Sequence, residues 1–102
     1  MAKLVAMYKT PSDPAAFDRH YYSTHVPLAK QIPGLRSYEV SVREVATPSG
    51  PSPYHLIAIL AFDSRAALQA GLDSPEGKAT AADLANFAQA GVELLVFDSR
   101  DI

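Results

Sequence analysis

The chain has 102 residues, 48% of them hydrophobic and 20% charged, which is the size and composition of one globular domain covering residues 1–102. Its 9 basic and 11 acidic residues form no basic run, which argues against nucleic acid and against a polybasic membrane anchor. The absence of cysteine excludes disulfides, a thiolate nucleophile and a zinc–thiolate site. Because neither a signal-peptide pattern nor a membrane-length apolar run is present, we expect a cytoplasmic protein that does not bind membranes.

A strand followed by a helix is predicted at the start of the chain. Residues 4–8 form an apolar run ended by turn residues, as expected for a strand. Asp13 is a suitable N-cap and Pro14 suits the first helical position, so a helix should begin there. Pro27 disfavours helical geometry in the residue before it, and we therefore expect a break or kink near His25.

The later elements complete a mixed α+β pattern. Apolar and polar residues alternate over 35–45, which predicts a strand with one wet face, and the proline-rich stretch 46–53 is expected to be a loop. The remaining elements are expected to be a strand at 54–62, helices at 65–70 and from Ser74 to about Ala88, and a strand at 92–97. This order predicts a ferredoxin-like βαββαβ domain with a four-stranded antiparallel sheet.

Three of the predicted strands are apolar on both faces, namely 4–8, 56–62 and 92–97. The predicted helices cover only one face of such a sheet, and strands that are apolar throughout are typical of sheets buried on both faces. A second copy of the sheet is the remaining cover. We therefore expect a homodimer in which two sheets pack face to face and close into a barrel.

The first helix carries the residues best suited to chemistry. On a helix Asp18, Tyr22 and His25 are spaced i, i+4 and i+7, so their side chains should line up on the side of the sheet, whereas His20 should point into solvent. An unperturbed imidazole titrates at about pH 6.5 and both donates and accepts protons. Tyr8, at the end of the first strand, should line the same cavity. Each of these residues also fits a structural role, with His25 capping helix carbonyls and the tyrosines packing.

Other kinds of site are not supported by the spacing. His20 and His25 should point about 140° apart on a helix, which leaves no convergent set of metal ligands. The glycines are scattered and form no phosphate-binding loop. Ser23, Thr24 and His25 diverge as helix neighbours and do not form a triad.

Several short motifs occur in order along nearly the whole chain. They are Tyr8-Lys9 with Pro11, Phe17 with Tyr21-Tyr22, Thr24 to Ala29, Ile32 to Leu35, Ser74 to Gly77, and Ala82-Asp83-Leu84 with Asn86-Phe87. These motifs resemble the EthD family, named for ethyl tert-butyl ether degradation, within the dimeric α/β-barrel superfamily. The resemblance implies a ferredoxin-like fold and a barrel-forming homodimer. It also implies His25 of the His-x-Pro motif as the site residue, with Asp83 and Asn86 as local capping or hydrogen-bonding residues.

Two functional hypotheses follow. In the first, the chain is a small-molecule enzyme of catabolic or polyketide-type metabolism, with acid/base or cofactor-independent oxidative chemistry on a hydrophobic carbonyl or aromatic compound. His25 would be the acid/base with Tyr22 and Tyr8 beside it, and the substrate would be bound by Asp18, Leu28, Tyr38 and Phe87. In the second, the chain is a non-catalytic dimeric ligand-binding protein or an accessory to an oxygenase system. No cofactor is expected; related barrels that bind haem make His25 the natural ligand if one is present.

Overall fold

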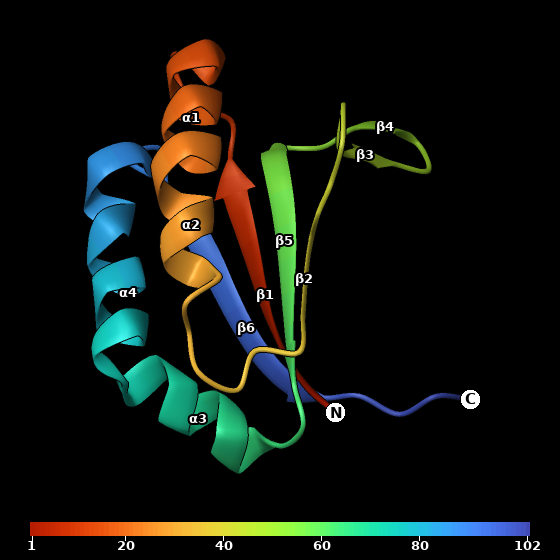
Figure 1. The fold of residues 1–102 in the computed structure, drawn as a ribbon. Helices are drawn as coiled ribbons and strands as arrows, with labels where there is room; N and C mark the ends of the chain where they lie inside the picture. The colour runs from red at the N-terminus through yellow and green to blue at the C-terminus, as the bar shows by residue number, and fades with distance from the viewer.

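A four-stranded antiparallel sheet with the strand order β2-β5-β1-β6 forms the centre of the computed structural model, which describes residues 1–102. Its strands are β1 (Ala2–Lys9), β2 (Ser37–Val40), β5 (Tyr54–Phe62) and β6 (Val92–Asp98). The helical segments α1 (Pro14–His20), η1 (Tyr21–His25), α2 (Val26–Ala29), α3 (Arg65–Asp73) and α4 (Pro75–Phe87) cover one face (Figure 1). The predicted ferredoxin-like α+β fold is confirmed.

The helices begin where the sequence predicts. Asp13, Ser64 and Ser74 cap α1, α3 and α4, and each side chain accepts the backbone N–H three residues further on. The predicted end of α3 is wrong, because the helix continues through Gly71. A Cβ on Gly71 would lie 2.8 Å from the carbonyl oxygen of Pro33, so this glycine permits close packing rather than a helix stop. None of the helices has the length and apolar character needed to cross a bilayer.

The strand predicted at 35–45 is much shorter in the structure. It forms only from Ser37 to Val40, and the stretch predicted as a loop contains a small hairpin of β3 (Ala46–Thr47) and β4 (Gly50–Pro51). The strand ends at Val40, and the φ of Arg43, which is 61°, lies in the left-handed region, so the chain is not extended through the predicted range. The alternating pattern continues past that residue in sequence but no longer corresponds to a sheet face.

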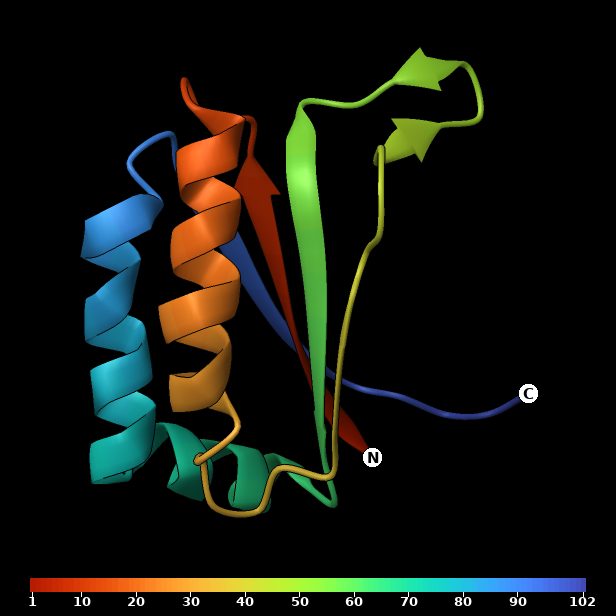
Figure 2. The same ribbon diagram turned by 45° about the horizontal axis from the view of Figure 1, so that its top comes forward.

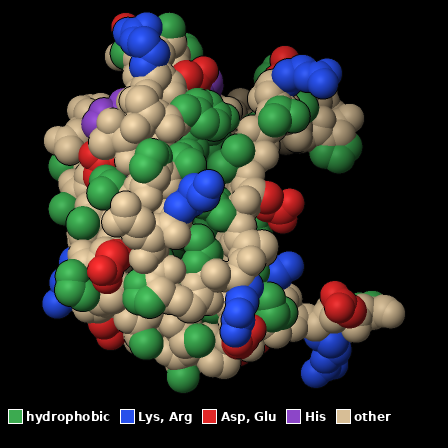
Figure 3. Space-filling model, in the orientation of Figure 1, with side chains coloured by type: hydrophobic (Ala, Val, Ile, Leu, Met, Phe, Trp, Pro, Cys, Tyr) green, Lys and Arg blue, Asp and Glu red, His purple; other side chains and the backbone are tan.

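The two faces of the sheet differ in cover. Side chains on the helix side of β1 and β5 are buried, as Tyr8 and Phe62 are. On the other face no element packs, and the hairpin and the C-terminal tail project past it (Figure 2). The space-filling view shows the two projections separated by a hollow (Figure 3). The apolar side chains of this open face are Val5, Met7, Ile57, Ile59, Leu95 and Phe97.

Candidate functional site

The first helix changes geometry at the proline instead of breaking. The segment η1 is π-helical, and the N–H of Val26 donates to the carbonyl of Tyr21, five residues earlier. In an α-helix the ring of Pro27 would clash with the carbonyl four residues before it, and the wider π turn avoids this. The break or kink predicted near His25 takes the form of this π-helical segment, and the helix does not end there, because it continues into α2.

The π turn brings the two histidines together. In π-helical geometry residues five apart are hydrogen-bonded neighbours, so His20 and His25 lie on one side of the helix rather than about 140° apart. Both reach Asp83 on α4: His20 Nε2 lies 2.9 and 3.0 Å from its two carboxylate oxygens, and His25 Nδ1 lies 2.9 Å from Oδ2. The prediction that His20 points into solvent is only partly right, because its side chain is 29% exposed but its Nε2 is bonded to Asp83.

Asp83 is the centre of this His20–Asp83–His25 cluster. Its side chain is only 5% exposed, and Asn86 donates a further hydrogen bond of 3.0 Å to Oδ1. The bond from Asn86 is the local contact that the family resemblance implied, but the two imidazoles come from another helix. Burial raises the pKa of the Asp83 carboxyl, and the hydrogen bonds from Asn86, His20 and His25 outweigh it and hold the pKa below its usual value. Asp83 is therefore ionised.

The carboxylate sets the tautomer of His25. An ionised carboxylate only accepts hydrogen bonds, so we assign the proton of neutral His25 to Nδ1, which leaves Nε2 as an acceptor. Nε2 lies 3.5 Å from the hydroxyl of Tyr8, at the outer limit of a hydrogen bond. Burial lowers the pKa of His25; the hydrogen bond and charge of Asp83 oppose this shift and His20 adds to it. His25 is thus a neutral imidazole with a basic nitrogen at near-neutral pH.

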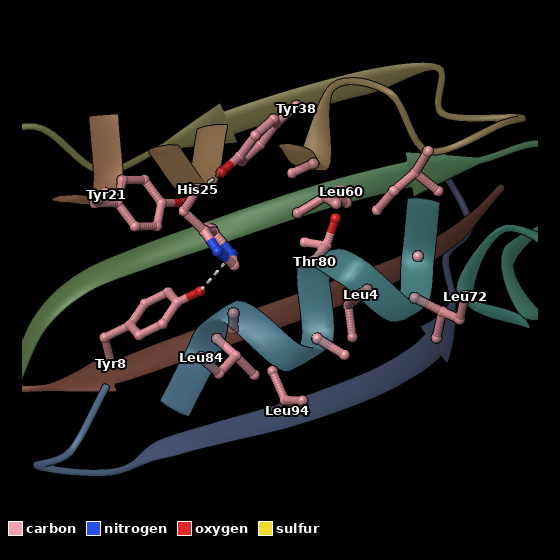
Figure 4. A pocket seen from close by; sticks show the side chains of 16 residues that line it. Leu4, Tyr8, Tyr21, His25, Tyr38, Leu60, Leu72, Thr80, Leu84 and Leu94 are labelled. Atoms are coloured by element: carbon pink, nitrogen blue, oxygen red, sulfur yellow. Dashed lines mark hydrogen bonds between the residues drawn. The ribbon is translucent and has the colours of Figure 1, made fainter. Parts of the chain in front are cut away.

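An apolar cavity lies next to His25, between the sheet and the helices (Figure 4). Its volume is about 170 Å³, and 13 of its 16 lining residues are hydrophobic. Apart from Thr80, whose hydroxyl donates to a backbone carbonyl, the polar groups gather around His25 and Tyr8, with the hydroxyls of Tyr21 and Tyr38 2.6 Å apart. Burial, as the largest cause, raises the pKa of all three tyrosines, which are therefore neutral phenols. The far end is formed by aliphatic side chains that include Leu4, Leu60 and Leu72.

Several of the predicted site residues meet at this cavity. Tyr8, His25 and Tyr38 line it. Phe87 packs against the imidazole of His25 with ring centroids 4.8 Å apart, so it supports the site without lining the cavity. Leu28 is half-buried on α2 and is not among the lining residues, which is a correction to its predicted position.

Tyr22 and Asp18 lie elsewhere, and the predicted alignment of these residues with His25 is wrong. The side chain of Asp18 bonds His55 Nε2 at 2.8 Å, and Tyr22 is 49% exposed. Both border a separate, mainly polar depression that also includes Arg43. The π turn rotates His25 away from the line on which an α-helix would place the three residues.

Sequence reasoning missed Asp83 and His20 as partners of His25. Asp83 lies on the buried face of α4 with Thr80 and Phe87, so a carboxylate on an apolar helix face was the available signal. Pro27 signalled a departure from α-helical geometry, but the sequence did not show that it would be a π turn, which is what redirects His20. The three side chains do not converge as metal ligands, and no group of three or more His, Cys, Asp or Glu residues in the chain does.

Comparison with known proteins places the chain in a family. The EthD domain model matches residues 9–91. An uncharacterised 11.0 kDa protein from the thcB–thcC intergenic region of Rhodococcus erythropolis is 42% identical over 100% of this chain and 98% of its own length. The solved structure of an ethyl tert-butyl ether degradation (EthD) family protein from Bacillus halodurans has a TM-score of 0.90 and 39% identity, covering 98% and 99% of the two chains. The chain belongs to the EthD family.

More distant structures share the fold alone. SnoaB from Streptomyces nogalater, a cofactor-independent oxygenase, is 15% identical with a TM-score of 0.70, covering 99% of this chain and 94% of its own. A ferredoxin-like protein of unknown function from Thermobifida fusca, described as dimeric, is 16% identical with a TM-score of 0.69 and covers 94% and 88%. Oxygenase and dimeric members thus occur among proteins of this fold.

Proposed function

We propose that this EthD-family chain is a small-molecule enzyme in which His25 moves a proton on an uncharged, apolar carbonyl or aromatic compound. The main support for this proposal is the orientation of His25, whose Nδ1 is hydrogen-bonded to a buried carboxylate while its Nε2 lies beside an apolar cavity. A neutral imidazole whose other nitrogen is bonded to a carboxylate is a positioned general base. Tyr22 and Asp18 have no part in this proposal, because they border another depression.

The proposed chemistry uses only the side chains around the cavity. Nε2 of His25 takes a proton from an O–H group or from a C–H group next to a carbonyl, and Asp83 stabilises the imidazolium that forms. The neutral hydroxyl of Tyr8 donates a hydrogen bond to the oxygen on which negative charge develops. Proton removal would likewise be the first step if the activated substrate then reacted with molecular oxygen. No cofactor is invoked.

The cavity favours a small neutral substrate. Its volume of about 170 Å³ is close to the roughly 150 Å³ of a dry engineered cavity that holds benzene, so one ring with a short substituent fits. No Lys, Arg, Asp or Glu lines it, and a charged compound would be desolvated without a partner.

We also propose that the chain is a homodimer joined through the open sheet face. Leu95 and Phe97 on this face are 52% and 41% exposed. Burying such apolar surface in a dimer interface is energetically favourable. Light scattering should give a mass near twice 10.9 kDa. Phe97→Lys should yield monomers, whereas Val42→Lys, at a 72% exposed position on another segment, should not. A monomeric wild-type mass at micromolar concentration would contradict this arrangement.

The enzyme proposal is tested without knowledge of the natural substrate. Phenol and cyclohexanone are suitable probes, and a bound probe should raise the melting temperature. The protein should also catalyse exchange of the α-hydrogens of cyclohexanone with deuterated water, followed by NMR. His25→Ala should reduce this exchange by about 10²–10⁴-fold, whereas His55→Ala should leave it unchanged. Binding without exchange would favour the non-catalytic ligand-binding alternative. If the protein bound neither probe and catalysed no exchange, both the enzyme and the ligand-binding hypotheses would be contradicted.

A further inference from the structure

We propose that His20 and His25 share one proton around Asp83, and that His20 is the outlet through which this site exchanges its charge with water. The inference rests on the proposed function of His25 as a base. It adds a residue that does not touch the cavity, because His20 is absent from its lining.

Access to water differs sharply within the cluster. The side chains of His25 and Asp83 are 6% and 5% exposed, whereas that of His20 is 29% exposed. His20 also borders a second, mostly polar depression, which includes Ser12, Asn86 and Gln89. Its Nε2 bonds Asp83, and its Nδ1 has no hydrogen-bond partner in the chain. His20 is therefore the member of the cluster that meets solvent.

Packing fixes the two rings in these positions. The ring of His20 stacks on Phe87 with centroids 5.1 Å apart and an interplanar angle of 23°, and the ring of His25 packs against Phe87 at 4.8 Å. Both imidazoles are thus held between α4 and the first helix with a nitrogen toward the same carboxylate. A rotation that separates either ring from Asp83 would break a hydrogen bond and this aromatic contact.

The charges favour one proton on the cluster rather than two. With one added proton on the imidazoles, the cluster is neutral, because the carboxylate balances it. The more exposed His20 holds this proton at lower desolvation cost, so His25 stays neutral and able to accept. The groups that face His25 from the sheet and from its own helix are the neutral phenols Tyr8, Tyr21 and Tyr38, while Asp13 lies at the rim of the depression beside His20.

Catalysis then moves charge without moving a proton through the carboxylate. When the bond between substrate and proton breaks and the Nε2–H bond of His25 forms, two imidazolium ions surround one carboxylate. His20 relieves this by losing its Nδ1 proton to water, while its Nε2–H continues to donate to Asp83. Asp83 remains ionised throughout, as the carboxylate does in a Ser-His-Asp triad. When His25 returns its proton to the product, His20 takes one up from water.

The sharing of the proton is tested by NMR titration of the imidazoles in the absence of substrate. In wild-type protein the ring of His25 should titrate below the usual pKa of an imidazole. The glutamine in His20→Gln can still donate an N–H to Asp83 but cannot become positively charged. The pKa of His25 should therefore rise in this variant. The matched control, His55→Gln, should leave the pKa of His25 unchanged. If the pKa of His25 is unchanged by His20→Gln in folded protein, the proposal is wrong.

The outlet role is tested by the deuterium-exchange assay. His20→Gln should slow turnover by about tenfold, and added imidazole buffer should restore the rate in this variant but not accelerate the wild type. A slow variant that buffer does not rescue would overturn the outlet role and leave a structural one. Coupled titrations in a wild-type protein without exchange activity would overturn the proposed function, and the outlet role with it, while establishing that the two rings share a proton.

Discussion

Two histidine–aspartate pairs in this protein have nearly the same contact distance and different surroundings. His25 and Asp83 are 2.9 Å apart with side chains 6% and 5% exposed, whereas His55 and Asp18 are 2.8 Å apart with side chains 22% and 49% exposed. An exposed pair of this kind contributes about 0–1 kcal/mol, because water solvates the separated partners well. A buried pair has no such alternative, so losing one partner is costly.

The surroundings of the two histidines also differ, with the buried pair next to the more apolar space. His25 adjoins a cavity lined almost entirely by apolar side chains, where a bound substrate would contact mainly hydrophobic groups. The depression beside His55 is lined mainly by polar residues and includes the exposed side chains of Tyr22 and Arg43. A hydrogen-bonded histidine and carboxylate therefore mark a candidate site only when burial and an adjacent cavity accompany them.

Removing the carboxylate should destabilise the protein more at the buried pair than at the exposed pair. Asp83→Ala leaves the buried imidazole of His25 without its acceptor, and we expect a loss of about 1–3 kcal/mol in the free energy of unfolding. Asp18→Ala should cost about 0–1 kcal/mol. Urea denaturation followed by circular dichroism measures both. Equal losses in the two variants would show that burial does not distinguish the pairs.

The pH dependence of stability should come from the buried pair. The folded-state pKa of His25 is lowered by burial, so below its unfolded value of 6.5 the unfolded chain binds more protons at this residue. Stability should therefore fall as the pH drops from 7 toward 5, with a slope from this one group of at most about 1.4 kcal/mol per pH unit. Because the folded-state pKa of Asp83 is lowered, protonating this carboxyl should cause a further loss of stability when the pH falls below its usual pKa of 3.8.

The source of this pH dependence of stability is tested with one histidine variant from each pair. His25→Gln should flatten the slope between pH 7 and 5, and His55→Gln should retain it, as measured by urea denaturation at each pH. A slope that persists in His25→Gln would assign the effect to another group.

Salt should produce the smallest difference. The coupling energy between Asp18 and His55, measured by a double-mutant cycle at pH 5.5, should shrink toward zero between roughly 0.1 and 1 M sodium chloride, because screening acts on exposed charges. The coupling between Asp83 and His25 should change little, since ions do not reach it. If both couplings fell alike, the Asp83 pair would be as open to solvent as the other.

Much of the fold was predictable because its determinants are local. The N-caps Asp13, Ser64 and Ser74 and the apolar runs at 4–8 and 54–62 act over a few residues, and each produces the expected element. The strand predicted at 35–45 is too long, because alternation reveals neither the end of strand pairing at Val40 nor the left-handed conformation of Arg43. In the site, His25, Tyr8 and Tyr38 were named from sequence and line one cavity, although their roles remain predictions.

By itself the sequence determined an α+β sheet with one helical face, the EthD family and a polar helix segment that contains His25. Tertiary structure alone decided which groups surround that histidine. Pro27 is accommodated by a π turn, and this turn, which no residue pattern specifies, carries His20 to the side of His25. Asp83 comes from a helix that is 58 residues away along the chain, and its contact with both rings depends on how the two helices pack. Local propensity selects each element, but the partners of a side chain are set by long-range packing.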